Sequence, residues 1–187
     1  MRFRFPMILA VVAAIAAGVS LAPATGHAAG KAATIEQHAR EALDLLKENS
    51  EAAKRLADDA TGILVFPKIV KGGLIVGGQY GEGALFQNGM VKQYYSTAAA
   101  SFGLQAGLQT FGYAVFFLNN TGMNYLDNSD GWEIGTAPNV VVVDEGAATS
   151  LTTTSAKKDI YVFFFDQKGL MAGLTIEGSK ITQINPD

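Results

Sequence analysis

Residues 84–95 read Ala-Leu-Phe-Gln-Asn-Gly-Met-Val-Lys-Gln-Tyr-Tyr, which is two apolar runs joined by the pair Asn88-Gly89. Asn-Gly between such runs is the strongest short-range signal for a β-hairpin, because a type I′ turn needs positive φ at both central residues. Further short apolar runs, separated by glycines and small polar residues, follow one another from Gly62 to the end of the chain. No segment with helical periodicity is evident between them, so the pattern predicts an antiparallel sheet without helical crossovers.

The glycines of this region are unusually crowded. The chain has 187 residues and 21 glycines, and the stretch 72–83 holds six of them. Glycine weakens a strand, so a cluster indicates bends, bulges or a close approach of the backbone. Neither the glycine spacing of a dinucleotide fingerprint nor the Gly-Lys-Ser/Thr of a P-loop is present. We therefore expect a curved sheet or a small barrel rather than a phosphate cradle.

The segment ahead of the sheet, residues 34–60, has helical periodicity. One apolar face is formed by Ile35, Ala39, Ala42, Leu43 and Leu46. Thr34 and Gln37 have the spacing of a capping box, and Asn49-Ser50 can end one helix and cap a second. The predicted fold class is α+β, with N-terminal helices packed on a curved, glycine-rich antiparallel sheet or small barrel.

The first 28 residues resemble a secretory signal peptide. Two arginines precede an uncharged run of 16 residues at positions 7–22, and Gly26 and Ala28 are the small residues that a signal peptidase requires. This predicts a signal peptide at 1–28, one domain at 29–187, and delivery to the periplasm of a bacterial envelope. Cleavage after Ala29 and an uncleaved anchor are the alternatives, although the run is short for a spanning helix.

Charge and cysteine content exclude several classes of protein. The net charge is −3, and loss of Arg2 and Arg4 would lower Lys+Arg from 14 to 12 against 17 acids, a balance of −5. Such a chain binds neither nucleic acid nor an anionic bilayer through its overall charge, so any anion site must be local. The absence of cysteine excludes disulfides, thiolate metal sites and a cysteine nucleophile.

Catalytic groups are scarce. His38 would be the one imidazole left after cleavage, and it lies on the polar side of the first predicted helix. Asp144 and Glu145 follow the predicted strand at 140–143; neighbours at a strand end point to opposite faces and make a poor acid/base pair, so a solvated turn is the expected role. Residues 127–131 resemble part of a calcium loop but lack its glutamate at position twelve. We therefore expect no enzyme activity, no cofactor and no metal ion.

Basic residues lie close to apolar ones just before and within the first predicted strand. If the end of the second helix meets this strand in space, four cations converge beside apolar side chains. That combination suits a phosphate headgroup with an acyl chain beside it. The candidate lipid-binding residues are Lys54, Arg55, Lys68, Lys71, Phe66, Ile69 and Val70. The alternative is that these lysines only keep a loop and a strand edge soluble.

Four ordered blocks resemble the SYLF-domain family. They are Ala-Thr-Gly-Ile-Leu-Val-Phe-Pro-Lys-Ile-Val-Lys-Gly-Gly at 60–73, Gly-Gly-Gln-Tyr-Gly-Glu-Gly at 77–83, Ala-Ser-Phe-Gly-Leu-Gln-Ala-Gly-Leu-Gln at 100–109, and Phe-Asp-Gln-Lys-Gly-Leu-Met-Ala-Gly-Leu-Thr-Ile-Glu-Gly-Ser-Lys-Ile at 165–181. The resemblance implies lipid binding rather than catalysis, since eukaryotic relatives bind phosphoinositides and bacterial relatives are exported proteins often described as lipid-binding. Yeast relatives also contact actin.

Within this resemblance, Lys68 and Lys71 stand in the family's Phe-Pro-x-x-x-Lys-Gly block and become candidates for headgroup contact. A periplasm offers neither actin nor, ordinarily, phosphoinositides, and the chain lacks the SH3 or FYVE domain that many relatives carry. The expected ligand is therefore phosphatidylglycerol, cardiolipin or another anionic envelope lipid. The alternative function is a structural or protein-interaction module of the envelope, using Tyr94-Tyr95 or the aromatic run 163–165 against a protein partner.

Overall fold

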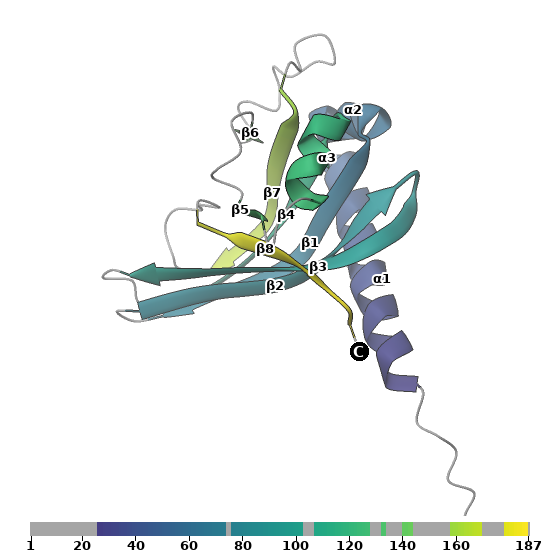
Figure 1. The fold of residues 1–187 in the computed structure, drawn as a ribbon. Coiled ribbons are helices and arrows are strands. Elements are labelled where there is room, and N and C mark those ends of the chain that lie inside the picture. The colour runs from purple at the N-terminus through teal and green to yellow at the C-terminus, as the bar shows by residue number, and fades with distance from the viewer. Residues whose placement is uncertain are drawn as a thin grey trace, which may run out of the picture.

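The computed structural model describes residues 26–73, 76–102, 107–127, 132–133, 140–143, 158–169 and 178–186 (Figure 1). Two helices come first, and strands with one further helix follow. In chain order the elements are α1 (Gly26–Asn49), α2 (Glu51–Asp59), β1 (Gly62–Gly73), β2 (Val76–Gln87), β3 (Met90–Phe102), β4 (Gly107–Phe117), α3 (Asn120–Asp127), β5 (Trp132–Glu133), β6 (Val140–Val143), β7 (Ile160–Gly169) and β8 (Lys180–Ile184).

The described strands form one sheet in the order β5-β8-β3-β2-β1-β4-β7-β6. Neighbours are antiparallel except β6 and β7, which run parallel. The α+β class is therefore confirmed, and the sheet is open rather than a barrel, with β5 and β6 at its edges. Two expectations were wrong: one strand pair is parallel, and a helix, α3, intervenes after β4. The strand expected near residues 170–176 and the polar stretches 128–131 and 144–145 lie outside the described residues.

The predicted hairpin turn is confirmed between β2 and β3. Asn88 has φ 52° and Gly89 has φ 75°, the positive pair that a type I′ turn needs. Arg40 of α1 donates a hydrogen bond to the Gly89 carbonyl oxygen at 3.1 Å, and its guanidinium carbon lies 5.0 Å from the centre of the Phe86 ring. The turn thus holds the first helix against one end of the sheet.

Glycines allow β2 to approach a bulge in β1. The register between the two strands shifts between Val65 and Lys68, where Pro67 interrupts the ladder. A Cβ on Gly83 would collide with the Val65 carbonyl oxygen, and one on Gly81 would lie 2.8 Å from the Lys68 carbonyl oxygen. The close backbone approach expected from the glycine cluster is therefore present.

The helices follow the predicted apolar stripe but not the predicted start. α1 already begins at Gly26, and the Thr34 hydroxyl donates to the Gly30 carbonyl oxygen at 2.7 Å, so Thr34 is inside the helix and not its cap. Ser50 does cap α2, because its hydroxyl accepts a hydrogen bond from the Ala53 amide at 3.2 Å. Cleavage after Ala28 would remove the first three residues of α1 and leave the buried stripe from Ile35 onward intact.

The sheet separates two apolar cores. On the α1 face, the stripe of α1 and the apolar side of α2 pack on side chains such as Ile63, Val65 and Phe116. On the α3 face, α3 contributes Met123 and Leu126 to a core with other side chains of the same strands. Those side chains include Leu64, Phe66, Ile69, Phe111, Tyr113 and Val162. Alternate residues of β1 thus serve opposite faces.

Candidate functional site

The structure does not bring the four predicted cations together. Lys54 and Arg55 lie on the exposed side of α2, and the Arg55 guanidinium is 3.9 Å from the Glu51 carboxylate one helical turn earlier. Lys68 and Lys71 belong to β1, but they point to opposite faces of the sheet. The expected convergence is therefore not found, because the first pair sits on the outer side of a helix and the second pair is divided by the pleat.

The apolar candidates divide in the same way. Phe66 and Ile69 are fully buried in the core of the α3 face, and Lys71 shares that face and is 8% exposed. Lys68 and Val70 alternate with them and are exposed on the α1 face. Of the seven predicted residues, only these last two present their side chains to solvent next to each other on the sheet. Whether any of the seven contacts a lipid stays a prediction.

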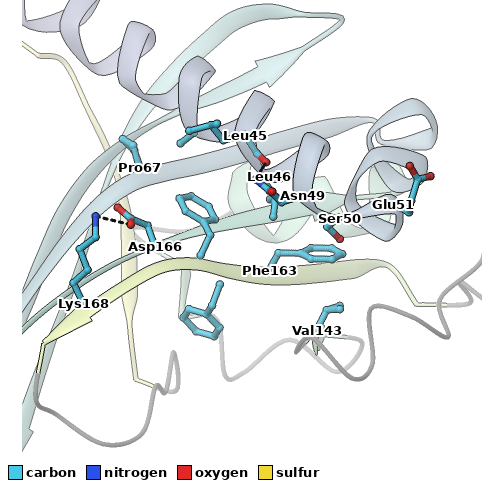
Figure 2. Close-up of a pocket in the computed structure, with 13 residues that line it drawn as sticks. Leu45, Leu46, Asn49, Ser50, Glu51, Pro67, Val143, Phe163, Asp166 and Lys168 are labelled. Carbon is cyan, nitrogen blue, oxygen red and sulfur yellow. Dashed lines mark hydrogen bonds and ion pairs between the residues drawn. The ribbon is translucent and has the colours of Figure 1, made fainter.

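A groove with largely apolar walls lies on the α1 face, between the α1–α2 corner and β7 (Figure 2). Its volume is about 830 Å³. The helical wall includes Leu45, which is 58% exposed, and Leu46. Figure 2 shows Phe163 and Val143 across from this wall, and the pair Asp166–Lys168 at one end. The remaining lining residues are Ala42, Asn49, Ser50, Glu51, Pro67, Phe164 and Phe165.

A second cavity of about 430 Å³ continues the first along α1. The two share Ala42, Leu45, Pro67, Asp166 and Lys168. The second cavity adds polar lining from His38, Glu41, Lys68 and Thr110, together with Phe111. We call the two together the α1–β7 trough. Its apolar lining lies between Leu45 and Leu46 on one side and the aromatic residues of β7 on the other, with polar residues 49–51 at the α1–α2 corner and Lys68 and Lys168 at the opposite end.

The two lysines of the polar end differ in their partners. Lys168 lies 2.7 Å from the Asp166 carboxylate, and both side chains are largely exposed. An exposed pair of this kind contributes about 0–1 kcal/mol, so Lys168 can exchange Asp166 for another anion at little cost. Within the described part of the chain, Lys68 has no ion pair. Its ammonium is therefore available to a ligand.

Glu82 is the cross-strand neighbour of Lys68, but its carboxylate already has other hydrogen-bond partners. Its carboxylate accepts a hydrogen bond from Lys31 at 3.0 Å and from the Tyr80 hydroxyl at 2.8 Å. Burial acts to raise the pKa of Glu82, but these two donors outweigh burial and the pKa is lowered. Burial and the same carboxylate raise the pKa of Tyr80 to about 12. Glu82 is therefore ionised at neutral pH and engaged away from Lys68.

Lys168 was not identified as a site residue from the sequence, although Lys168 belongs to a block that carried the family resemblance.

Among the residues described, no three His, Asp or Glu side chains are grouped so that they could hold a metal ion. None of the described helices is both long and apolar enough to cross a membrane.

Residues 98–186 match the family model Ysc84, described as Las17-binding protein actin regulator. The matched stretch contains β4, α3, β7 and β8, and therefore supplies Lys168 and the aromatic side of the trough, whereas α1 and Lys68 lie before it. No curated protein matches the chain. Residues 98–186 thus match the Ysc84, or SYLF-domain, family model, which is consistent with the resemblance of the four sequence blocks to that family.

Proposed function

We propose that this protein binds an anionic phospholipid without catalysing a reaction on it. An acyl chain lies in the apolar part of the α1–β7 trough, and the headgroup phosphate lies at the end that carries Lys68 and Lys168. The observation that carries the proposal is the continuity of an apolar cavity with two accessible ammonium groups. The predicted signal peptide would deliver the protein to the cell envelope, where such lipids are found.

The size and lining of the trough support an acyl chain as the apolar part of the ligand. A volume of about 830 Å³ falls within the range of about 300–1,000 Å³ that is usual for small-molecule sites. Leu45 is exposed on a helix whose other leucines at 43 and 46 are buried, and the aromatic rings of β7 lie across from it. Burial of each methylene contributes about 0.8 kcal/mol, so a chain covering these side chains gains several kcal/mol.

The charges at the polar end support an anionic headgroup. Lysine binds phosphate as a point charge, and Lys68 lacks an ion pair within the described residues. Glu41 and Asp166 line the same end, so free phosphate gains little there. Apolar burial therefore supplies most of the affinity, and the lysines select the headgroup.

The test measures binding of lysophosphatidylglycerol and lysophosphatidylcholine as monomers, below their critical micelle concentrations, by titration calorimetry. The chain beginning at Ala29 is suitable, because the described core residues all lie between 35 and 181. We expect the anionic lipid to bind more tightly, and Lys68→Ala/Lys168→Ala to weaken it about five-fold, equivalent to about 1 kcal/mol for two exposed contacts.

The matched control is Lys54→Ala/Lys92→Ala, which removes the same number of positive charges at exposed residues that line neither cavity. We expect the control to bind both lipids as the unmodified chain does. Equal affinity for the two headgroups, or the same loss in both double variants, would contradict the proposal.

Binding of a protein partner is the second candidate, and the family description favours it because it names a protein ligand. The predicted aromatic contacts support it only in part: Tyr95 and Phe163 are buried core residues, while Tyr94, Phe164 and Phe165 are half-buried. Native mass spectrometry of the purified protein separates the two candidates. A co-purifying lipid supports the first, and its absence together with a failure to bind either lysolipid leaves the second.

A further inference from the structure

The α1 face of the sheet is covered over only part of its length. α1 and α2 bury one end of it, and four large apolar side chains stay exposed toward the other end. These are Val70, Val76, Tyr80 and Leu108, which are between 42% and 63% exposed. Each lies on the α1 face, because Val70 alternates with buried residues of β1 and the others follow from its cross-strand register. Figure 1 shows β2 and β3 extending well beyond the helices in this direction.

Cross-strand pairing places these residues in an ordered surface. One continuous row crosses six strands, because each member is the backbone partner of the next. From β8 to β7 the row reads Lys180, Ala98, Tyr80, Val70, Thr110 and Lys168. A second row, toward the strand ends, contains Ala100, Gly78, Gly72 and Leu108. The surface is therefore apolar in the middle, with a lysine at each end of the first row.

We propose that this surface, which we call the exposed row, docks the protein on an anionic lipid bilayer and turns the mouth of the trough toward the lipid. The proposal rests on the proposed function. It follows from continuity, since Thr110 and Lys168 belong to the row and also line the trough beside Lys68. A lipid leaving the bilayer at the row would meet the headgroup end of the trough without crossing solvent.

The charge pattern favours a bilayer over a second copy of the chain. Lysine side chains can lay their apolar stems on the surface and extend their ammonium groups to lipid phosphates. Glu82 is the acid nearest the middle of the row, and it is engaged by Lys31 and Tyr80. Lys180 has Glu133 as its backbone partner in β5. In a two-fold dimer through this face, the lysine at one end of the row would meet a lysine of the other copy, which is unfavourable.

The test compares two measurements on the chain beginning at Ala29. Sedimentation with phosphatidylcholine vesicles containing 30 mol% phosphatidylglycerol reports docking, and titration with monomeric lysophosphatidylglycerol reports the trough. The test variant is Val76→Ser/Leu108→Ser, and the control is Met90→Ser, which removes an equally exposed apolar side chain at the opposite end of β3. We expect the double variant to bind vesicles at least ten-fold more weakly and the lysolipid within two-fold of the unmodified chain. The control should match the unmodified chain in both.

Four results overturn the inference. The first is equal vesicle binding by the double variant and the unmodified chain, with lysolipid binding intact. The second is equal binding to vesicles with and without phosphatidylglycerol, and the third is an equal loss in Met90→Ser. The fourth is a change from dimer to monomer in light scattering of the double variant, which would assign the row to a second copy. A failure of the proposed function looks different, because the unmodified chain would then not bind the lysolipid at all.

Discussion

The packing of β2 against β1 requires a residue without a side chain at position 83. A Cβ there would collide with the Val65 carbonyl oxygen and lie 2.7 Å from the Phe66 ring, and both residues belong to a buried strand paired on both sides. We predict that Gly83→Ala lowers the free energy of unfolding by about 2–3 kcal/mol, as overpacking of a core does. Urea denaturation measures the effect.

Gly78→Ala in the same strand is the matched control for this prediction. A Cβ on Gly78 would have the Ala99 carbonyl oxygen as its nearest neighbour, at 3.5 Å, which is an ordinary contact. We expect a change within about 0.5 kcal/mol, as for other surface substitutions. Similar losses in both variants would show that the collision at Gly83 is not what limits the site.

The position of a single site residue could be predicted from the sequence only where side chains alternate regularly between the two faces of a strand. Lys68 was identified from its apolar neighbours, but the bulge at Pro67 adds one residue to β1 and puts Phe66 on the same face as Ile69. Regular alternation would have placed Phe66 beside Lys68 instead. Lys168 reaches the trough because β7 packs opposite α1, a long-range contact that no local sequence pattern reports.

At the level of elements, the junction between α1 and α2 depends on one cap. The Ser50 hydroxyl accepts the Ala53 amide at 3.2 Å, and Leu46 and Ala53 on either side of it are buried on the sheet. We predict that Ser50→Ala lowers the free energy of unfolding by about 1 kcal/mol, since it leaves an amide of the first turn without its acceptor. Urea denaturation should show recovery of most of this loss in Ser50→Asp, because aspartate also caps helices. An equal loss in both variants would argue that the hydroxyl does not act as a cap.

Elements with strong local signals were predictable, and elements that depend on tertiary pairing were not. The hairpin at Asn88-Gly89 and the cap at Ser50 follow from backbone preferences of the residues themselves. α3 has only eight residues, too few to show periodicity, although the Asn119 side chain accepts the Gly122 amide at 2.9 Å and is a recognisable cap. β6 pairs in parallel with β7. This pairing depends on the sheet edge at which the strand can add, and the sequence of the strand does not specify that edge.

Across the whole molecule, the proposed binding surfaces lie on one face of the sheet, and the opposite face carries a buried core that stabilises the fold. The α3 face is closed by a core, whereas the α1 face carries helices over one part, the trough beside them and the exposed row beyond. α1 is held at the hairpin turn by Arg40 and near β2 by the ion pair of Lys31 with Glu82. Substitutions in the exposed row should therefore affect binding with little effect on folding, and substitutions on the α3 face should do the reverse.

The α3-face core also makes the stability of the whole molecule sensitive to alkaline pH. Burial raises the pKa of Tyr95 to about 12, with Asp127 adding to the shift, and burial raises the pKa of Tyr113 further above its usual value despite its hydrogen bond to Thr97. Because these phenols stay protonated in the folded state while the unfolded chain ionises near pH 10, stability is unchanged below pH 10 and falls above it. At pH 11 each contributes a loss of up to about 1.4 kcal/mol. Urea denaturation at pH 9 and pH 11 should show this loss. Tyr113→Phe should remove only the share of Tyr113, because Tyr80, Tyr94 and Tyr95, whose pKa values are also raised, keep theirs. An undiminished loss in Tyr113→Phe would mean that other groups control the alkaline transition.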